Sequence, residues 1–168
     1  VVLTAHTREA AGNAAKLFRD RLAKKKYLAV VFGWPKEDEW TVNAKLGKDP
    51  TDVKGFRERV DEENGKASET SFKVLQRGYC TLDGANRGVE VSRLECRPVT
   101  GRRHQIRLHL MHSGHPILGD MAYSDDTDSY RMFLHALELV MPFEEETLTF
   151  ATEPPESFND VMSAERTH

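Results

Sequence analysis

The segment from Lys26 to Trp34 restricts the fold more than any other part of this sequence. It reads Lys-Tyr-Leu-Ala-Val-Val-Phe-Gly-Trp and is followed at once by Pro35. β-Branched and aromatic residues dominate it, and its apolar residues are consecutive, whereas a strand with one face in water would alternate apolar and polar residues. We therefore predict a central strand of a sheet, ended by the proline.

Several other segments have the composition of strands or of their connections. Two of them, Ala67 to Gln76 and Gly88 to Arg97, are separated by a turn-rich segment and are predicted to form an antiparallel pair. The remaining expectations are the end of a buried strand at Val1 to Ala5, a half-buried strand at Trp40 to Leu46, a loop or short surface helix at Gly47 to Lys66, and a strand pair at Phe133 to Met141 and Glu146 to Thr152.

Two helices are predicted among these strands. Thr7 can cap a helix that runs to about Arg21, with apolar residues at helical spacing and Glu9 in the first turn. A second helix is predicted from Arg102 to Met111, with Thr100 as its cap. Few helices among many strands favour an α+β fold built on a largely antiparallel or mixed β-sheet.

Composition excludes several classes of protein. The chain has 168 residues, of which 39% are hydrophobic and 30% charged, as expected for one globular domain. Cys80 and Cys96 lack the CxxC spacing of a zinc ribbon, so a reducing, intracellular compartment is favoured, with the cytoplasm ahead of an organelle or the nucleus. No stretch approaches the roughly 18 apolar residues of a membrane span, so no membrane association is expected.

Charge is distributed unevenly, although the net charge is only −3. Between Arg8 and Lys26 there are seven basic residues and two acids, and between Arg93 and Arg107 five basic residues and one acid. Taken alone, either cluster is better explained as a solvated surface than as a binding site. Together they allow one basic face.

The most informative stretch is Thr100 to Leu110, which reads Thr-Gly-Arg-Arg-His-Gln-Ile-Arg-Leu-His-Leu. Arg103 and Arg107 would lie on one helix face, where like charges cost roughly 0.2–0.5 kcal/mol unless an anion lies between them. Arginine can grip a carboxylate or a phosphate with two parallel hydrogen bonds. Without other information, a solvated basic helix would be the better explanation of this pattern.

Other motifs offer weaker alternatives. His109 and His112 could share a helix face, but no nearby thiolate or carboxylate completes a zinc set, so hydrogen-bonded structural roles are favoured for these histidines and for His104 and His115. The acids from Asp125 to Asp128 lack the offsets of a calcium loop. Walker A, GxGxxG and GxSxG patterns are absent from the sequence. We expect no metal and no cofactor.

The sequence resembles the RluA-type pseudouridine synthases, which isomerise uridine to pseudouridine in RNA. Four matches occur in the family's order and together extend over nearly the whole chain. They are Lys26-Tyr27-Leu28-Ala29; Gly65-Lys66-Ala67 with Thr70; Gly101 to Arg107 continuing into Gly114-His115-Pro116-Ile117-Leu118-Gly119-Asp120; and Phe133-Leu134-His135-Ala136. The third match is highly specific.

The resemblance implies roles for particular residues. Tyr27 matches the active-site tyrosine that contacts the target uracil, and Arg107 matches the arginine that pairs with the catalytic aspartate. That aspartate lies in a His-Arg-Leu-Asp motif, just before a strand similar to Val1 to Ala5, and the motif is absent here. Neither Asp20 nor Asp120 matches it. The candidates for contacts with the RNA backbone are Arg19, Arg21, Lys24, Lys25, Arg102 and Arg103.

These observations give one main hypothesis and two alternatives. We expect residues 1–155 to be a partial pseudouridine synthase catalytic domain from a longer, monomeric protein that acts on tRNA or rRNA, and residues 156–168 to be a polar tail. Without its aspartate the chain alone should be inactive. The alternatives are an RNA-binding module or degenerate paralogue without catalysis, and a metal-binding protein.

Overall fold

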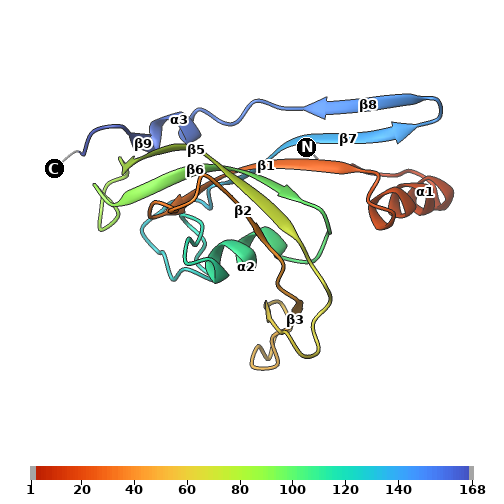
Figure 1. Cartoon of the computed structure of the whole chain (residues 1–168), viewed down its shortest axis with the longest axis horizontal. Helices are drawn as coiled ribbons and strands as arrows, with labels where there is room; N and C mark the ends of the chain where they lie inside the picture. Colours follow the sequence, from red (N-terminus) through yellow and green to blue (C-terminus); the bar gives the residue numbers. More distant parts are fainter. Residues whose placement is uncertain (1–2, 167–168) are drawn as a thin grey trace.

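A seven-stranded antiparallel sheet organises the chain in the computed structural model, which describes residues 3–166 (Figure 1). The strands of its main path follow the order β2-β5-β6-β1-β7-β8, and a short strand, β9, pairs with β5. The elements are α1 (Arg8–Arg19), β1 (Lys24–Phe32), β2 (Glu39–Val42), β3 (Leu46–Lys48), β4 (Glu58–Val60), β5 (Thr70–Cys80), β6 (Glu90–Pro98), α2 (Gln105–His112), β7 (Leu134–Phe143), β8 (Glu146–Ala151), α3 (Ser157–Asp160) and β9 (Met162–Ser163). A mainly antiparallel sheet with few helices is the predicted α+β class.

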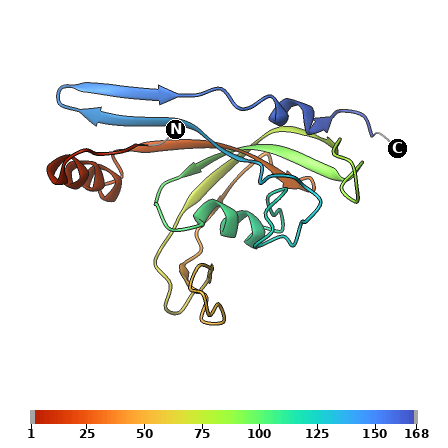
Figure 2. The same cartoon turned by 180° about the vertical axis from the view of Figure 1, so that it is seen from behind.

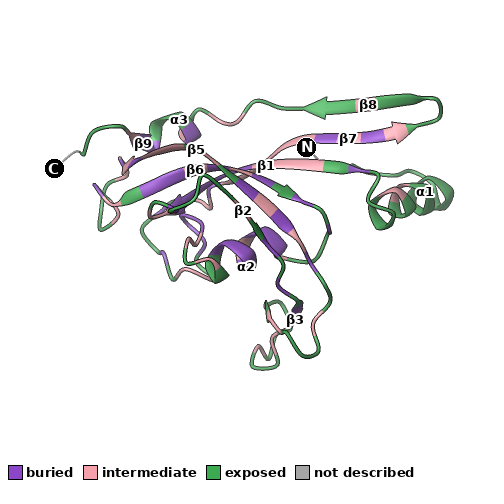
Figure 3. Ribbon diagram, viewed as in Figure 1, coloured by how far each residue is buried: buried purple, intermediate pink, exposed green. Residues whose placement is uncertain are grey.

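Strand β1 lies between β6 and β7 and is buried on both faces, as its apolar run predicts. Ala29 and Val31 pack into a cluster on the α2 side of the sheet, while Leu28 and Val30 pack into a second cluster on the other side. Because successive side chains of a strand point to opposite faces, only consecutive apolar residues can supply both clusters. Figure 3 shows this burial concentrated around β1, β6 and α2.

One face of the sheet is covered by α2, which Figure 2 shows from behind. Ile106 and Leu110 of this helix join the cluster formed by Ala29, Leu94 and Phe72. After α2 the chain returns to β1, where the Leu118 amide donates to the Val30 carbonyl at 2.9 Å and the Phe133 amide donates to the Leu118 carbonyl at 2.9 Å. These bonds fix the segment that follows α2 against the central strand.

The expected polar tail differs from the structure. Phe158, Val161 and Met162 belong to the second core cluster, and Phe158 is completely buried. Its ring packs edge-on against Phe133, with the ring centroids 5.4 Å apart. These three residues have the i, i+3, i+4 spacing of one helical face. The polar residues around them led to the prediction of a polar tail.

The N-terminal helix confirms one local prediction and departs from another. The Thr7 hydroxyl accepts a hydrogen bond from the Ala10 amide at 3.1 Å, so Thr7 caps α1 as predicted. Yet α1 has no buried residue, and it lies at the margin of the sheet beside β7 and β8 (Figure 1). The predicted strand at Val1 to Ala5 is not observed at residues 3–5, and residues 1–2 lie outside the described part.

The segment from residue 47 to 66 contains a hairpin rather than a loop or helix. Strands β3 and β4 form a separate two-stranded sheet that projects from the α2 side of the main sheet (Figure 1). The predicted strand from Trp40 to Leu46 is accordingly divided between β2 and β3. The hairpin is fixed to the body near α2, as described below.

We predict that the buried C-terminal segment contributes to stability. Phe158→Ala should lower the free energy of unfolding by about 3–5 kcal/mol, because the ring leaves a cavity that the surrounding core fills only partly. Phe143→Ala is the matched control, since Phe143 is 54% exposed and its loss should cost less than about 1 kcal/mol. Urea denaturation of both variants measures the difference, and equal losses would contradict a core role for Phe158.

Candidate active site

A cavity of about 290 Å³ lies between the first half of β1 and the start of α2. Its walls come from three parts of the chain: β1, the segment from the end of β6 into α2, and the residues around the start of β7. They are Lys25, Tyr27, Pro98, Thr100, Gly101, Arg102, His104, Gln105, Ile106, Arg107, Met132 and Leu134. The cavity thus brings together four of the predicted site residues, namely Tyr27, Arg107, Lys25 and Arg102.

Tyr27 occupies an irregular position in β1. The pairing of β1 with β7 shifts register between Lys26 and Tyr27, so that Tyr27 lies opposite Ala136 on one side and Cys96 on the other. Such bulges bend a strand locally and redirect a side chain. The Tyr27 phenol is partly buried, and the loss of solvent raises its pKa. The hydroxyl therefore keeps its proton at neutral pH and is able to donate a hydrogen bond.

Arg107 is held by a carboxylate that the sequence reasoning did not connect with it. Its Nε and Nη2 donate to the two carboxylate oxygens of Asp120 at 2.8 and 2.6 Å. The Asp120 side chain is 1% exposed and that of Arg107 16% exposed, so this is a nearly buried ion pair. The carboxylate engages one edge of the guanidinium, and Nη1 lies on the other edge.

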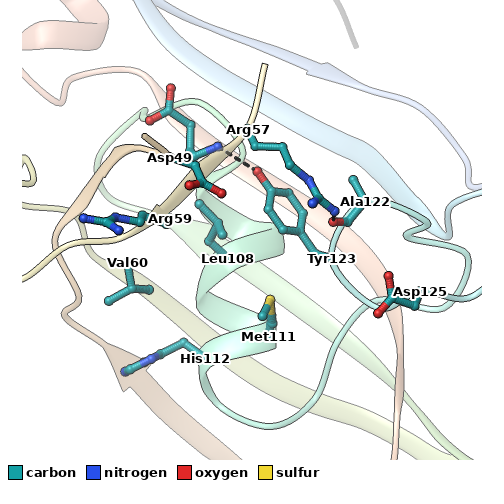
Figure 4. Close-up of a pocket in the computed structure, with 11 residues that line it drawn as sticks. Asp49, Arg57, Arg59, Val60, Leu108, Met111, His112, Ala122, Tyr123 and Asp125 are labelled. Atoms are coloured by element: carbon teal, nitrogen blue, oxygen red, sulfur yellow. Dashed lines mark hydrogen bonds between the residues drawn. The ribbon is translucent and has the colours of Figure 1, made fainter. Parts of the chain in front are cut away.

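Tyr123 lies against the same arginine and was also missed. The guanidinium carbon of Arg107 is 4.6 Å from the centre of the Tyr123 ring, within the range of a cation–π contact. The Tyr123 hydroxyl is 2.8 Å from Nδ1 of His104 and accepts a hydrogen bond from the Glu58 amide at 3.1 Å. Figure 4 shows the ring among Arg57, Leu108 and Met111, with its hydroxyl directed to the hairpin. The sequence feature that could have pointed to Tyr123 is its position, only three residues after Asp120.

Helix α2 starts three residues later than predicted. The helix begins at Gln105, after His104 in a left-handed conformation with φ of 53°, and not at Arg102. The Gln105 side chain explains this, because its oxygen accepts hydrogen bonds from the Arg102 amide at 2.9 Å and from the Thr100 hydroxyl at 2.7 Å. Arg103 therefore precedes the helix and does not share a helix face with Arg107.

His109 has the structural role expected of these histidines. It is completely buried, with Nδ1 2.9 Å from the Thr70 hydroxyl and Nε2 2.9 Å from the Ser68 hydroxyl. Burial lowers its pKa, which favours the neutral ring. His104 and His115 are likewise hydrogen-bonded, to Tyr123 and to the Phe32 carbonyl, whereas His112 is exposed. Within residues 3–166 no cluster of three His, Cys, Asp or Glu residues could hold a metal ion.

The predicted RNA-contacting residues lie in three places. Lys25 and Arg102 line the cavity; the Lys25 ammonium donates to the Thr100 carbonyl at 3.0 Å, and desolvation lowers its pKa. Arg103 is exposed beside the hairpin, with its guanidinium carbon 5.7 Å from the centre of the Phe56 ring. The others lie outside the cavity lining, on α1 or near the start of β1; they are Arg19, Arg21 and Lys24.

The rest of the described chain adds two observations. None of the helices within residues 3–166 combines the length and the apolar character that a membrane crossing needs. The two free cysteines, Cys80 and Cys96, are buried in the sheet, and burial raises the pKa of both thiols. They are therefore poor nucleophiles.

Comparison with known proteins links this chain to the RNA pseudouridylate synthases. A family model described as RNA pseudouridylate synthase matches residues 1–112. RNA pseudouridylate synthase domain-containing protein 1 of Mus musculus is 36% identical over 154 residues, which cover 87% of this chain and 48% of the mouse protein. The dual-specificity RNA pseudouridine synthase RluA of Haemophilus influenzae is 37% identical over 155 residues, covering 89% of this chain and 66% of that protein.

A solved structure agrees with these sequence matches. Human RNA Pseudouridylate Synthase Domain Containing 1 superposes with a TM-score of 0.81 and 31% identity, over 96% of this chain and 68% of the human chain. The chain spans about half the length of the first curated relatives that it matches.

We predict that His109 makes stability depend on pH. Because its pKa is lowered in the folded state, the unfolded chain binds more protons below the ordinary histidine pKa of about 6.5, and stability falls as the pH is lowered from about 7 to about 5.5. His109→Gln should flatten this fall while lowering stability at neutral pH. The exposed His112→Gln is the control; it removes only the smallest of the contributions that lower the His109 pKa, so it should change the slope much less than His109→Gln does.

Thermal melts at several pH values measure both slopes. Part of the slope should persist in His109→Gln, because burial also lowers the pKa of His104. A slope in His109→Gln as steep as that of the unsubstituted chain would show that His109 is not the group responsible.

Proposed function

This chain belongs to the RNA pseudouridylate synthase family, and we propose that it is the body of the catalytic domain of an RluA-type synthase that converts uridine in RNA to pseudouridine. The proposed substrate is a uridine of tRNA or rRNA. One observation supports this most directly. Tyr27 and Arg107 both line the cavity, and these are the two residues whose roles the family resemblance implies.

The reaction replaces a bond from carbon to nitrogen by a bond from carbon to carbon. The target uridine must first leave its stack, because its reacting atoms are inaccessible inside folded RNA. An aspartate then attacks the nucleoside and forms a transient covalent bond to it, and the bond between N1 and C1′ breaks. The uracil rotates so that C5 bonds to C1′, and the bond to the aspartate breaks again, which releases the carboxylate. C5 loses a proton and N1 gains one, so that no cofactor or oxidant is consumed.

Tyr27 and Arg107 would act at different stages of this sequence. The raised pKa of Tyr27 keeps its hydroxyl protonated, so we propose that it contacts the uracil as a hydrogen-bond donor and relays the C5 proton only in concert with another acceptor. Arg107 would use the edge that carries Nη1 to hold the catalytic carboxylate ionised, since a nearby cation favours the charged form of an acid. Its other edge is already engaged by Asp120.

The nucleophile itself is proposed to come from a segment that is not part of this chain. No carboxylate is among the residues that line the cavity. Asp120 is buried, and both of its oxygens are engaged by Arg107, which makes it a poor nucleophile. The family's His-Arg-Leu-Asp motif, which the sequence lacks, would precede residue 1. We therefore propose that this chain alone is inactive.

The decisive experiment compares this chain with a version extended upstream by its natural sequence. Both are incubated with total RNA from cells that lack the enzyme, and pseudouridine formation and RNA binding are measured. We expect activity in the extended form alone. Inactivity of both forms, despite RNA binding, would favour the second candidate, an RNA-binding module without catalysis. Activity of the short chain would show that its nucleophile lies among residues 1–168.

We predict that Arg107→Ala in the extended form lowers the turnover rate by at least about 100-fold, because the charge that holds the nucleophile is lost. RNA affinity should change little, since phosphate contacts elsewhere dominate it. Arg107→Lys is the second variant, which keeps the charge but loses the grip on two oxygens. It should recover only part of the rate.

Arg87→Ala is the matched control, because Arg87 pairs with Asp83 in an exposed turn away from the cavity. The melting temperature of each variant identifies any loss that arises from unfolding rather than from chemistry. Near-normal turnover by folded Arg107→Ala would remove Arg107 from the catalytic set.

A further inference from the structure

We propose that Tyr123 is a positioning residue for Arg107, and that it ties the position of the guanidinium to the docked β3–β4 hairpin. The inference rests on the proposed role of Arg107. It arises from a set of contacts around Arg107 that neither the family motif nor the cavity lining identifies.

Asp120 alone does not fix the guanidinium completely. Its two hydrogen bonds lie along one edge of a planar group, and a planar group held at one edge can still tilt about that edge. The guanidinium carbon of Arg107 lies over the Tyr123 ring, 4.6 Å from its centre, so the ring blocks tilting of the guanidinium toward it. The carboxylate and the ring together determine where the Nη1 edge points.

A local turn places the carboxylate and the ring on the same side of Arg107. The Tyr123 amide donates to the Asp120 carbonyl at 3.1 Å, and the Ala122 amide approaches the Asp120 carboxylate at 3.3 Å. The Leu118 amide bonds to β1, so this turn is fixed relative to the central strand just before Asp120. The sequence Asp-Met-Ala-Tyr at 120–123 therefore presents both groups to one arginine.

The Tyr123 hydroxyl is held by two different elements. It accepts a hydrogen bond from the Glu58 amide of β4, which leaves its own hydrogen for Nδ1 of His104. His104 can accept that hydrogen because desolvation and the neighbouring arginines lower its pKa, which favours the neutral ring. Tyr123 is thus oriented by the residue that precedes α2 and by the hairpin.

The hairpin has further contacts near this point. The Arg57 guanidinium donates to the Ala122 carbonyl, and Arg103 donates to the Gly55 carbonyl at 3.3 Å. The Arg57 guanidinium carbon also lies 5.8 Å from the centre of the Tyr123 ring. A displacement of the hairpin would therefore move Tyr123 first and, through its ring, the guanidinium of Arg107.

The test uses single-turnover measurements on the extended form over a range of pH. In Tyr123→Leu the ring is lost, and the rate should fall by roughly 10- to 100-fold, as expected for a misplaced catalytic group. RNA affinity should stay within about threefold. The acid limb of the rate profile should move to higher pH, because a loosened Arg107 no longer keeps the nucleophile ionised as effectively.

Two further variants separate positioning from a merely structural role. Tyr123→Phe keeps the ring against the guanidinium but loses the hydroxyl contacts to β4 and to His104, so it should recover most, but not all, of the rate and of the wild-type acid limb. Tyr130→Leu is the matched control from the same connection, since Tyr130 is 69% exposed and contacts Phe133 instead of Arg107. A wild-type rate and acid limb in Tyr123→Leu, or equal losses in Tyr130→Leu, would overturn the proposal.

A measurement without catalysis distinguishes failure of this proposal from failure of the proposed function. In the present chain, the side-chain Nε–H of Arg107 can be followed by NMR, because it donates to Asp120. Its hydrogen exchange should be at least about tenfold faster in Tyr123→Leu and nearly unchanged in Tyr123→Phe. Unchanged exchange in Tyr123→Leu refutes the positioning role. An inactive extended wild type refutes the proposed function instead.

Discussion

The double-sided burial of β1 is the constraint on which the rest of the structure depends. A strand with Leu28 and Val30 on one face and Ala29 and Val31 on the other cannot lie at the surface of the molecule. It needs paired strands at both edges and a cover on both faces. Strands β6 and β7 supply the edges. The covers are α2 on one face and the segment around Phe133 and Phe158 on the other.

The same constraint determines where the cavity forms. The apolar run of β1 begins at Leu28, whereas Lys24 to Tyr27 are exposed or half-buried. Helix α2 covers the apolar part through Ile106 and Leu110, so its first turn lies over the point where the strand becomes polar. Tyr27 and Arg107 meet there because one is the last residue before the run and the other belongs to the first turn of the cover.

How far the sequence predicts this arrangement depends on the range of the interaction. The cap at Thr7 and the centre of β1 were predicted correctly, because each depends on neighbouring residues. The start of α2 was not, because the side chain of Gln105 bonds back to Thr100 and to Arg102. The spacing of Arg103 and Arg107 therefore suggested a shared helix face that the chain does not form.

The site shows the same limit. The resemblance singled out Tyr27 and Arg107, and both line one cavity. The pairing of Arg107 with Asp120, thirteen residues later, depends instead on the return of the chain to β1. No periodicity in the sequence encodes that return. Tyr123 was missed for a related reason, since a tyrosine in a polar connection has no apolar pattern to distinguish it from an exposed one.

The charges around the cavity bear on the proposed chemistry. Lys25, Arg102 and Arg107 line it, and the buried Asp120 balances one of these three cations. Formally, two positive charges remain beside a cavity that has no carboxylate in its lining. Under the proposed mechanism, two anions must enter, namely the nucleophilic aspartate and a phosphate of the extracted nucleotide. Isolated charges are costly away from water, so the excess positive charge of the site favours binding of both the aspartate and the phosphate. Asp120 therefore serves the proposed reaction by holding Arg107 at one edge, which leaves the Nη1 edge for the nucleophile, while Lys25 and Arg102 keep a net positive charge beside the cavity for the RNA.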